Sequence, residues 1–266
     1  MAQSFVDFDD YPAGSDVSDF FTPAWGSYDY LQVVDIPSDN RPGQSDELGN
    51  KALRAIGLTN LWARRALKYE MINGSENDEI YAVVGSNDAH LTTTIITLTL
   101  RGGGTSEATR AGYQVWIRAG SNNLQIRKKL SGVSSTLASV TTPSNLWDSA
   151  PIVWFTASAQ GSSVSLQVKL WSGVNNTEYT LSATDNSPLP VGWMAISHVR
   201  GEPMFVGAVG FGTDGDPAPT GFVEVSAEPF ALRHNPRTNK VIPVLSSPTV
   251  TDIGANCVRP RVTKGY

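Results

Sequence analysis

The stretch GYQVWIRAGSNNLQIRKKL (residues 112–130), followed by PIVWFTASAQGSSVSLQVKLW (residues 151–171), decides the fold class. Side chains on a β-strand point alternately to opposite faces, so a half-buried strand alternates apolar and polar residues. Both stretches show this alternation on either side of a polar turn. We therefore predict two β-hairpins, each with one apolar face that must be buried against another sheet.

Short runs of the same kind fill most of the remaining chain. They predict further strands near residues 5–8, 25–33, 79–85, 92–100, 193–197, 205–211 and 222–227. Residues 50–71 are ambiguous because they are rich in helix formers, yet Gly57 and Asn60 would weaken a helix there. We favour two strands for this run, and the helix remains the alternative. The pattern as a whole predicts an all-β jelly-roll β-sandwich.

The C-terminal part of the chain has a different character. Residues 233–266 contain four prolines and only short apolar runs. This is too little chain to bury a core of its own. We therefore divide the protein into a β-sandwich over residues 1–231 and a docking arm over residues 232–266, in which Pro243, Pro248, Arg259 and Arg261 stand out.

Charge and composition exclude several classes of protein. A formal net charge of −5 and a pI near 5.2 argue against nucleic acid as a partner, because phosphate binding needs a basic surface. Cys257 is the single cysteine, so no disulfide within the chain and no cysteine-based zinc site is expected. The N-terminal residues lack the pattern of a secretory signal, and no apolar run approaches the roughly 20 residues of a membrane span. We expect synthesis in a cytoplasm and no membrane partner.

Several sequence segments resemble those of known protein families. The succession GYQVWIR, LQIRKKL, VSLQVKLW and PVGWMAI resembles the concanavalin A-like jelly roll, also called laminin-G-like, over roughly residues 4–232. VGAVGFGTDGDPAPTG (residues 206–221) and PVLSSPTVTDIGANCVRPRVT (residues 243–263) look like phrases in structural proteins of tailed bacteriophages. The second segment is similar to the first two strands of small immunoglobulin-like or fibronectin-like phage modules, but it stops at Tyr266, which suggests an arm completed by a neighbouring subunit.

The resemblance implies a non-enzymatic structural component of a phage virion, in a tail or capsid-surface appendage. Its expected partners are other virion proteins and further copies of itself, since virion proteins are usually symmetric oligomers. The expected location is the virion, after synthesis in the host cytoplasm. The alternative function is a lectin or adhesin that binds host-surface glycans, and a glycan hydrolase is the third, disfavoured class.

Catalysis is not expected. Glucanases of the resembled fold carry alternating carboxylates that face one cleft, and the acidic run at residues 76–79 is instead contiguous. Contiguous side chains would point to both faces of a strand, so we interpret this run as a solvated turn. The three histidines are scattered and no nucleophile motif accompanies them.

Calcium is the one metal for which the sequence offers ligands, and no other cofactor is expected. Asp214 and Asp216 lie on an Asp-Gly-Asp turn, and the resembled jelly rolls often carry calcium near their first and last strands. Asp7 or Asp9 would complete such a site. An Asp-Gly-Asp sequence is also an ordinary turn, which is the interpretation that we favour.

Trp116 is the best candidate for contact with a glycan. It shares the polar face of its strand with Gln114 and Arg118, and sugars stack their apolar faces on aromatic rings. The competing interpretation, which we favour, is that another sheet or subunit covers this face. In that case the polar residues would serve packing rather than binding.

Overall fold

The computed structural model describes residues 3–15, 22–25, 31–36, 51–55, 67–86, 95–106, 108–118, 123–143, 146, 152–172, 177–199, 204–220, 223–227, 230–235 and 240–243. Within them the chain is almost entirely β-strand, with one short 3-10 helix, η1 (Phe8–Asp10). None of the helices in this described part is long and apolar enough to cross a membrane.

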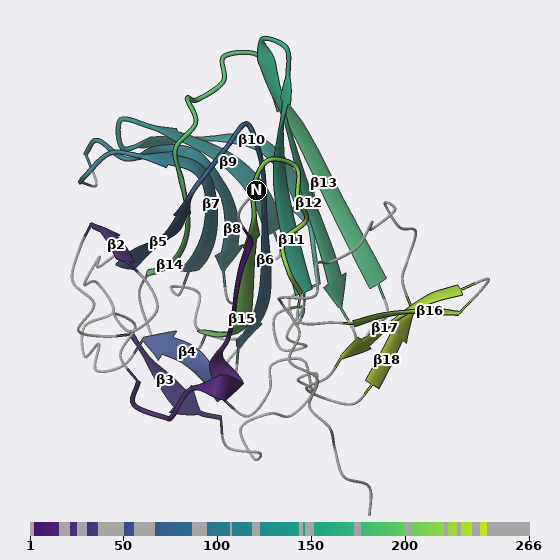
Figure 1. Cartoon of the computed structure of the whole chain (residues 1–266). Coiled ribbons are helices and arrows are strands. Elements are labelled where there is room, and N and C mark those ends of the chain that lie inside the picture. Colours follow the sequence, from purple (N-terminus) through teal and green to yellow (C-terminus); the bar gives the residue numbers. More distant parts are fainter. Residues whose placement is uncertain are drawn as a thin grey trace, which may run out of the picture.

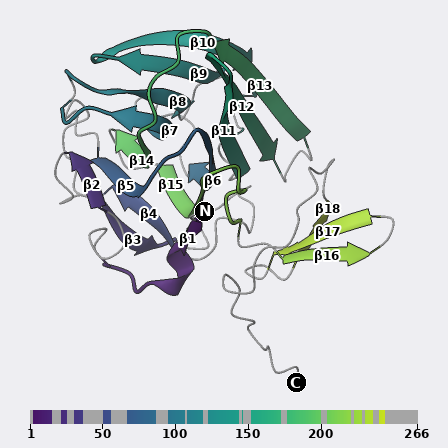
Figure 2. The same cartoon turned by 45° about the horizontal axis from the view of Figure 1, so that its top comes forward.

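Two antiparallel sheets form the sandwich (Figures 1 and 2). The eight-stranded sheet runs in the order β13 (Thr177–Asp185), β12 (Ser163–Ser172), β11 (Ile152–Gln160), β6 (Asn77–Ser86), β15 (Met204–Gly212), β4 (Lys51–Ala55) and β3 (Leu31–Asp35), and β1 (Gln3–Asp7) also pairs with β15. The seven-stranded sheet runs in the order β10 (Val133–Thr141), β9 (Asn123–Leu130), β8 (Ala111–Arg118), β7 (Ile95–Gly103), β14 (Trp193–Val199), β5 (Leu67–Asn73) and β2 (Thr22–Trp25).

The chain passes repeatedly from one sheet to the other, as from β5 to β6 to β7 and from β13 to β14 to β15. The predicted jelly-roll β-sandwich is therefore confirmed. A third sheet contains β16 (Val223–Ala227), β17 (Phe230–Asn235) and β18 (Lys240–Pro243), in that order. The predicted boundary between residues 231 and 232 falls within β17, which pairs with β16 from Val223 to Ala227.

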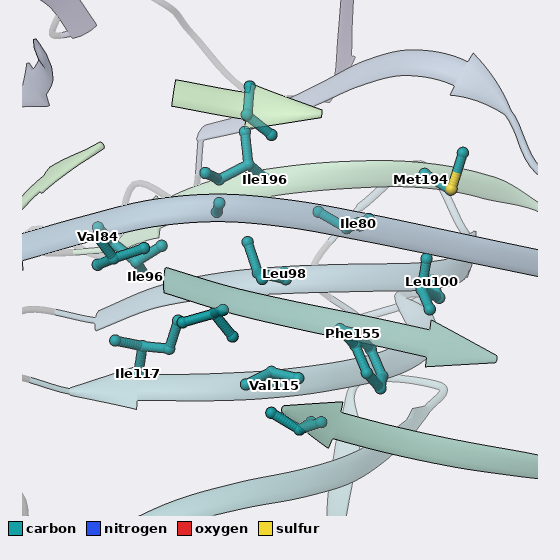
Figure 3. Close-up of a cluster of buried hydrophobic side chains, with 14 of the residues drawn as sticks. Ile80, Val84, Ile96, Leu98, Leu100, Val115, Ile117, Phe155, Met194 and Ile196 are labelled. Atoms are coloured by element: carbon teal, nitrogen blue, oxygen red, sulfur yellow. The ribbon is translucent and has the colours of Figure 1, made fainter. Parts of the chain in front are cut away.

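The main core lies between the two large sheets (Figure 3). Ile80, Val84 and Phe155 from the eight-stranded sheet meet side chains of the other sheet, all of them fully or almost fully buried. Those facing side chains are Ile96, Leu98, Leu100, Val115, Ile117, Met194 and Ile196. Each such side chain stabilises the fold by roughly 1.5–3 kcal/mol through burial, so this cluster is the main source of stability.

A second, smaller cluster lies on the outer face of the eight-stranded sheet. It includes Tyr81 and Trp154, whose ring centroids are 5.7 Å apart, and Ala218 from the segment after β15. This segment lies so close to β15 that a Cβ on Gly210 would be 1.9 Å from the Pro219 carbonyl oxygen. Trp154 is half-buried and packs against this second cluster rather than in the main core.

The two hairpins that decided the fold class are confirmed as β8–β9 and β11–β12. The two strands favoured within residues 50–71 are confirmed as β4 and the start of β5, and residues 56–66 lie outside the described residues. The single strand expected over residues 25–33 is instead β2 and β3, which belong to different sheets. The sequence reading missed β10 and β13, in which serine and threonine obscure the apolar alternation.

Candidate functional site

The outer face of the seven-stranded sheet carries rows of polar side chains. These positions alternate along their strands with residues of the main core, so they face away from it. The strand register defines two rows that run across the sheet, and their residues carry hydroxyl, amide, indole or guanidinium groups. One row is Ser139, Gln125, Trp116, Thr97 and Ser197, and the next is Thr136, Arg127, Gln114 and Thr99.

This polar face is buried at its centre and open toward β10. Thr97, Thr99, Gln114 and Ser197 are at most 2% exposed. Trp116, Gln125 and Arg127 are half-buried, whereas Thr136 and Ser139 on β10 are exposed. Among the described side chains of these rows, those next to β10 are therefore the ones accessible to a ligand.

Hydrogen bonds satisfy the polar groups at the buried centre. The Thr97 and Ser197 hydroxyls bond to each other across β7 and β14. The Gln114 amide lies 3.4 Å from the Thr99 hydroxyl, and with its oxygen turned toward Arg110 it accepts from the guanidinium Nη2 at 2.5 Å. Because buried polar groups need such partners, Gln114 is a structural residue, and its predicted place on an exposed binding surface is wrong.

The accessible part of the face is organised around Trp116. The Arg127 guanidinium carbon lies 3.6 Å from the centroid of the indole ring, and Arg127 Nε donates to Gln125 Oε1 at 2.8 Å. The indole Nε1 lies 3.4 Å from the Gln114 amide. We call Trp116, Gln125 and Arg127 the Trp116 platform. It is a stacked, hydrogen-bonded group held in place before any ligand arrives.

Sequence reasoning had placed Arg118 beside Trp116 and had not included Gln125 or Arg127. Arg118 lies on β8 opposite Ile95, and its side chain is outside the described residues. The adjacent strand could have indicated the missing pair, because Gln125 and Arg127 alternate with core residues just as Gln114 and Trp116 do. Choosing them required the β8–β9 register, which places Gln125 opposite Trp116 and Arg127 opposite Gln114.

We predicted a solvated turn for the acidic run at residues 76–79, and the structure contradicts part of that prediction. Asn77 begins β6, and Asp78 is only 3% exposed because it lies opposite Ala157 and points into the sandwich. Glu79 is on the other face of the strand, where its Oε1 accepts from the Ala218 amide at 3.0 Å. These two carboxylates are therefore on opposite sides of one sheet and cannot act as a pair on one substrate.

Asp78 is a buried carboxyl group with one unsatisfied oxygen. Its Oδ1 accepts from the Ser75 amide at 2.7 Å and from the Ser75 hydroxyl at 2.9 Å, whereas its Oδ2 is buried without a hydrogen-bond partner. Burial raises the pKa of this carboxyl above its ordinary value, although the Ser75 hydrogen bonds oppose the rise. Burial therefore disfavours the ionised form of the Asp78 carboxyl in the folded protein.

The four aspartates predicted to hold calcium do not come together. In the β1–β15 register Asp7 is opposite Ala208, whereas Gln3 is opposite Gly212 and donates to the Pro217 carbonyl at 2.9 Å. Asp7 is thus at the other end of β15 from the Asp-Gly-Asp turn. Asp9 Oδ1 is engaged by the Lys51 amide at 2.6 Å. Among the described residues, no three His, Cys, Asp or Glu side chains group as metal ligands.

The Asp-Gly-Asp sequence is a tight turn, the interpretation favoured from the sequence. Asp214 has φ 59° and Gly215 has φ 85°, and the Asp216 amide donates to the Thr213 carbonyl at 3.0 Å. The Gly215 amide also donates to the Asn77 carbonyl at 3.0 Å, which ties the turn to β6. As a set, the four predicted residues do not fit one calcium ion.

A buried polar group at one end of the sandwich was missed by the sequence analysis. The Tyr113 hydroxyl donates to Asp185 Oδ2 at 2.6 Å and accepts from the Leu189 amide at 2.9 Å. Lys128 Nζ lies 2.7 Å from the same carboxylate oxygen and donates to the Ser187 carbonyl at 2.6 Å. This clamp of Tyr113, Lys128 and Asp185 holds the crossover that leads from β13 to β14.

Comparison with known proteins gives similarities of structure only. No family model matches the chain, and no curated protein is similar in sequence. Similar solved structures include the carbohydrate binding module CBM66 from Bacillus subtilis, at 14% identity and TM-score 0.43, covering 70% of this chain and 91% of that one.

Two further similar structures are a lectin and a lumenal domain. Lectin I-B4 from Griffonia simplicifolia in its metal-free form has 12% identity and TM-score 0.48, covering 80% of this chain and 99% of that one. The exoplasmic/lumenal domain of VIP36 in its Ca²⁺/Man3GlcNAc-bound form has 12% identity and TM-score 0.46, covering 81% and 93%. These similarities concern the arrangement of strands and assign no role to any residue of this chain.

Proposed function

We propose that this protein is a non-enzymatic carbohydrate-binding β-sandwich whose ligand contacts the Trp116 platform. The observation that carries the proposal is the stacking of Arg127 on Trp116 at 3.6 Å, with Arg127 fixed by Gln125, on the accessible part of a polar face. The similar structures include a carbohydrate binding module and a lectin, but the proposal rests on the platform.

The chemistry of the platform suits a saccharide. Sugar hydroxyls both donate and accept hydrogen bonds, and the platform offers the amide of Gln125 and the guanidinium of Arg127, which is stacked on one face of the indole. The hydroxyls of Thr136 and Ser139 extend the same rows onto β10. Since the stacked pair is held before binding, little side-chain entropy is lost when a ligand arrives.

A glycan array with the full chain, followed by calorimetry on each bound glycan, tests the proposal. We expect Trp116→Ala and Arg127→Ala each to weaken binding about tenfold or more, which corresponds to about 1.4 kcal/mol. Trp171→Ala is the matched control, because Trp171 is also half-buried but lies on β12 in the other sheet. It should bind as the unaltered protein does. An array without any specific glycan, or full binding by Trp116→Ala, would contradict the proposal.

We further propose that the protein acts on a tailed-bacteriophage particle, with residues 232–266 as its assembly arm. The sequence resemblance of residues 206–221 and 243–263 to phage structural proteins supports this location. Within the arm, Pro243 ends β18 opposite Leu232, and Pro248, Arg259 and Arg261 lie outside the described residues. Mass spectrometry and immunogold labelling of purified particles should locate the chain at a defined place. Its absence from particles would overturn this part of the proposal.

A further inference from the structure

The charged residues of the two large sheets are distributed unevenly. Five neighbouring strands of the seven-stranded sheet, in the order β10, β9, β8, β7 and β14, contain no aspartate or glutamate. Their basic residues are Arg101, Arg118, Arg127, Lys128 and Lys129. In the eight-stranded sheet, four strands contain acidic residues, which are Asp7, Asp35, Asp78, Glu79, Glu178 and Asp185.

The same contrast is present along the chain. Residues 108–147, which include β8, β9 and β10, contain five basic residues and no acidic residue. The whole chain has 20 basic and 25 acidic residues, which leaves 15 basic and 25 acidic residues outside this segment. The segment therefore has a formal charge of +5, and the rest of the chain has −10. Electrostatic forces direct an anionic ligand toward the segment and away from the rest of the protein.

The basic residues of these strands have different surroundings. Lys128 pairs with Asp185 at 2.7 Å, and Arg101 donates to two backbone carbonyls, so both stabilise the end of the sandwich. Arg127 instead lies half-buried on the outer face of the sheet, with its guanidinium stacked on Trp116. Arg127 is therefore the cation of the Trp116 platform that a ligand can contact.

Other positive charges surround Arg127 on the same face. In the strand register it lies opposite Gln114 on β8, and Lys129 follows two positions later on β9. With its oxygen turned toward Arg110, the Gln114 amide accepts from that guanidinium. Arg110 and Lys129 are buried, so they contribute through their charge rather than by touching a ligand. Charges in such partly buried positions are screened little by salt.

We propose that the glycan bound at the Trp116 platform is acidic, and that Arg127 contacts its carboxylate or sulfate group. This inference rests on the proposed function and adds the class of glycan. A guanidinium presents its N–H donors in one plane, a geometry that matches two oxygens of an acidic group. The indole of Trp116 and the amide of Gln125 hold that plane in one orientation before binding.

Nucleic acid is the other common polyanion, and the structure favours a glycan. A protein that follows a phosphate backbone uses cations spread along a groove, in a surface that is basic overall. Here the chain has a net charge of −5, and the half-buried Arg127 stands among hydroxyl and amide groups. These groups suit the neutral hydroxyls of a sugar next to a single acidic group.

Calorimetry with two matched pairs of polymers tests the proposal. One pair is polygalacturonate and its fully methyl-esterified form, and the other is dextran sulfate and dextran. We expect a charged polymer to bind the full chain at least tenfold more tightly than its neutral partner at low salt. This advantage should shrink as the salt concentration rises. The pair that shows it distinguishes a carboxylate from a sulfate.

Two substitutions at Arg127 separate charge from geometry. Arg127→Gln removes the charge and should reduce binding of the charged polymer about tenfold, whereas Arg127→Lys keeps the charge and should reduce it less. Lys169→Gln is the matched control, because it changes the net charge equally at a half-buried position of β12 in the other sheet. It should bind as the unaltered protein does. A thermal scan checks that each variant is folded.

The possible outcomes separate this inference from the proposed function. The inference is overturned if neutral glycans bind as tightly as charged ones, or if glycans bind on the array but neither charged polymer does. It is also overturned if Lys169→Gln weakens binding as much as Arg127→Gln, or if single-stranded poly(dT) binds as tightly as the charged polymer. A chain that binds no glycan, charged or neutral, contradicts the proposed function itself.

Discussion

At the scale of single residues, burial has opposite outcomes for two aspartates. Burial disfavours the charged form of Asp185, but hydrogen bonds from Lys128, Tyr113 and the Ser187 amide outweigh it and lower the pKa below its ordinary value. Among the described residues the hydrogen bonds to Asp78 come from Ser75, and burial prevails over them, so its pKa is raised. The first carboxylate stabilises the fold at neutral pH, and the second reduces its stability.

Tyr113→Phe tests the clamp at the end of the sandwich. The substitution keeps the buried ring but removes the hydroxyl that links Asp185 to the Leu189 amide. We expect it to lower the free energy of unfolding by about 1–3 kcal/mol, because it leaves buried partners unsatisfied. Urea denaturation measures the change. Tyr179→Phe on β13 is the control and should cost less, since Tyr179 is only partly buried; equal losses would contradict a specific role for the clamp.

Asp78→Asn tests whether the buried carboxylate destabilises the fold, through the pH dependence of the free energy of unfolding. The pKa of Asp78 in the folded protein is raised above the ordinary value of 3.8. The contribution of this carboxyl to the free energy of unfolding is therefore most favourable below pH 3.8, and it declines as the pH rises through the folded pKa. The amide carries no charge, and therefore the variant should gain stability relative to the unaltered protein as the pH rises above 3.8. Denaturation at a series of pH values measures this difference, and a constant difference at all pH values would refute the assignment.

At the scale of elements, the glycines of β15 explain the motif VGAVGFGTDGDPAPTG. The segment after the Asp-Gly-Asp turn folds back along β15, and Cβ atoms on Gly210 and Gly212 would lie 1.9 Å and 2.2 Å from the carbonyl oxygens of Pro219 and Asp216. Residues without a Cβ therefore allow backbone to lie directly on backbone. The segment brings Ala218 onto the second cluster.

Gly210→Ala should disrupt this contact. The added methyl would meet backbone that cannot move aside easily, so we expect a loss of about 1–3 kcal/mol in the free energy of unfolding. Gly103→Ala in β7 is the control, because its Cβ would meet only the Ala111 Cβ at 3.8 Å, an ordinary contact. Thermal denaturation of both variants distinguishes them. Equal stability of the two would show that the segment can shift away from β15.

At the scale of the whole molecule, every described side chain in the two hydrophobic clusters lies at or before Ala218. Strands β16 to β18 pair among themselves in a separate sheet. We therefore expect a chain that ends at residue 221 to fold and to unfold at nearly the same temperature as the full chain. Circular dichroism with a thermal scan measures this, and a molten or insoluble product would show that the sandwich needs its C-terminal part.

The sequence by itself determined the all-β class, the hairpins β8–β9 and β11–β12, and the polar face that contains Trp116. These features depend on alternation with a period of two and on turns between neighbouring strands, so they can be read from adjacent residues. Tertiary structure alone decided that Gln114 is buried, that Asp78 points into the sandwich and that the calcium candidates lie apart. It also joined Tyr113 to Asp185, which are 72 residues apart. The physical reason is that burial and pairing between distant segments depend on how the sheets stack, and no local pattern encodes that stacking.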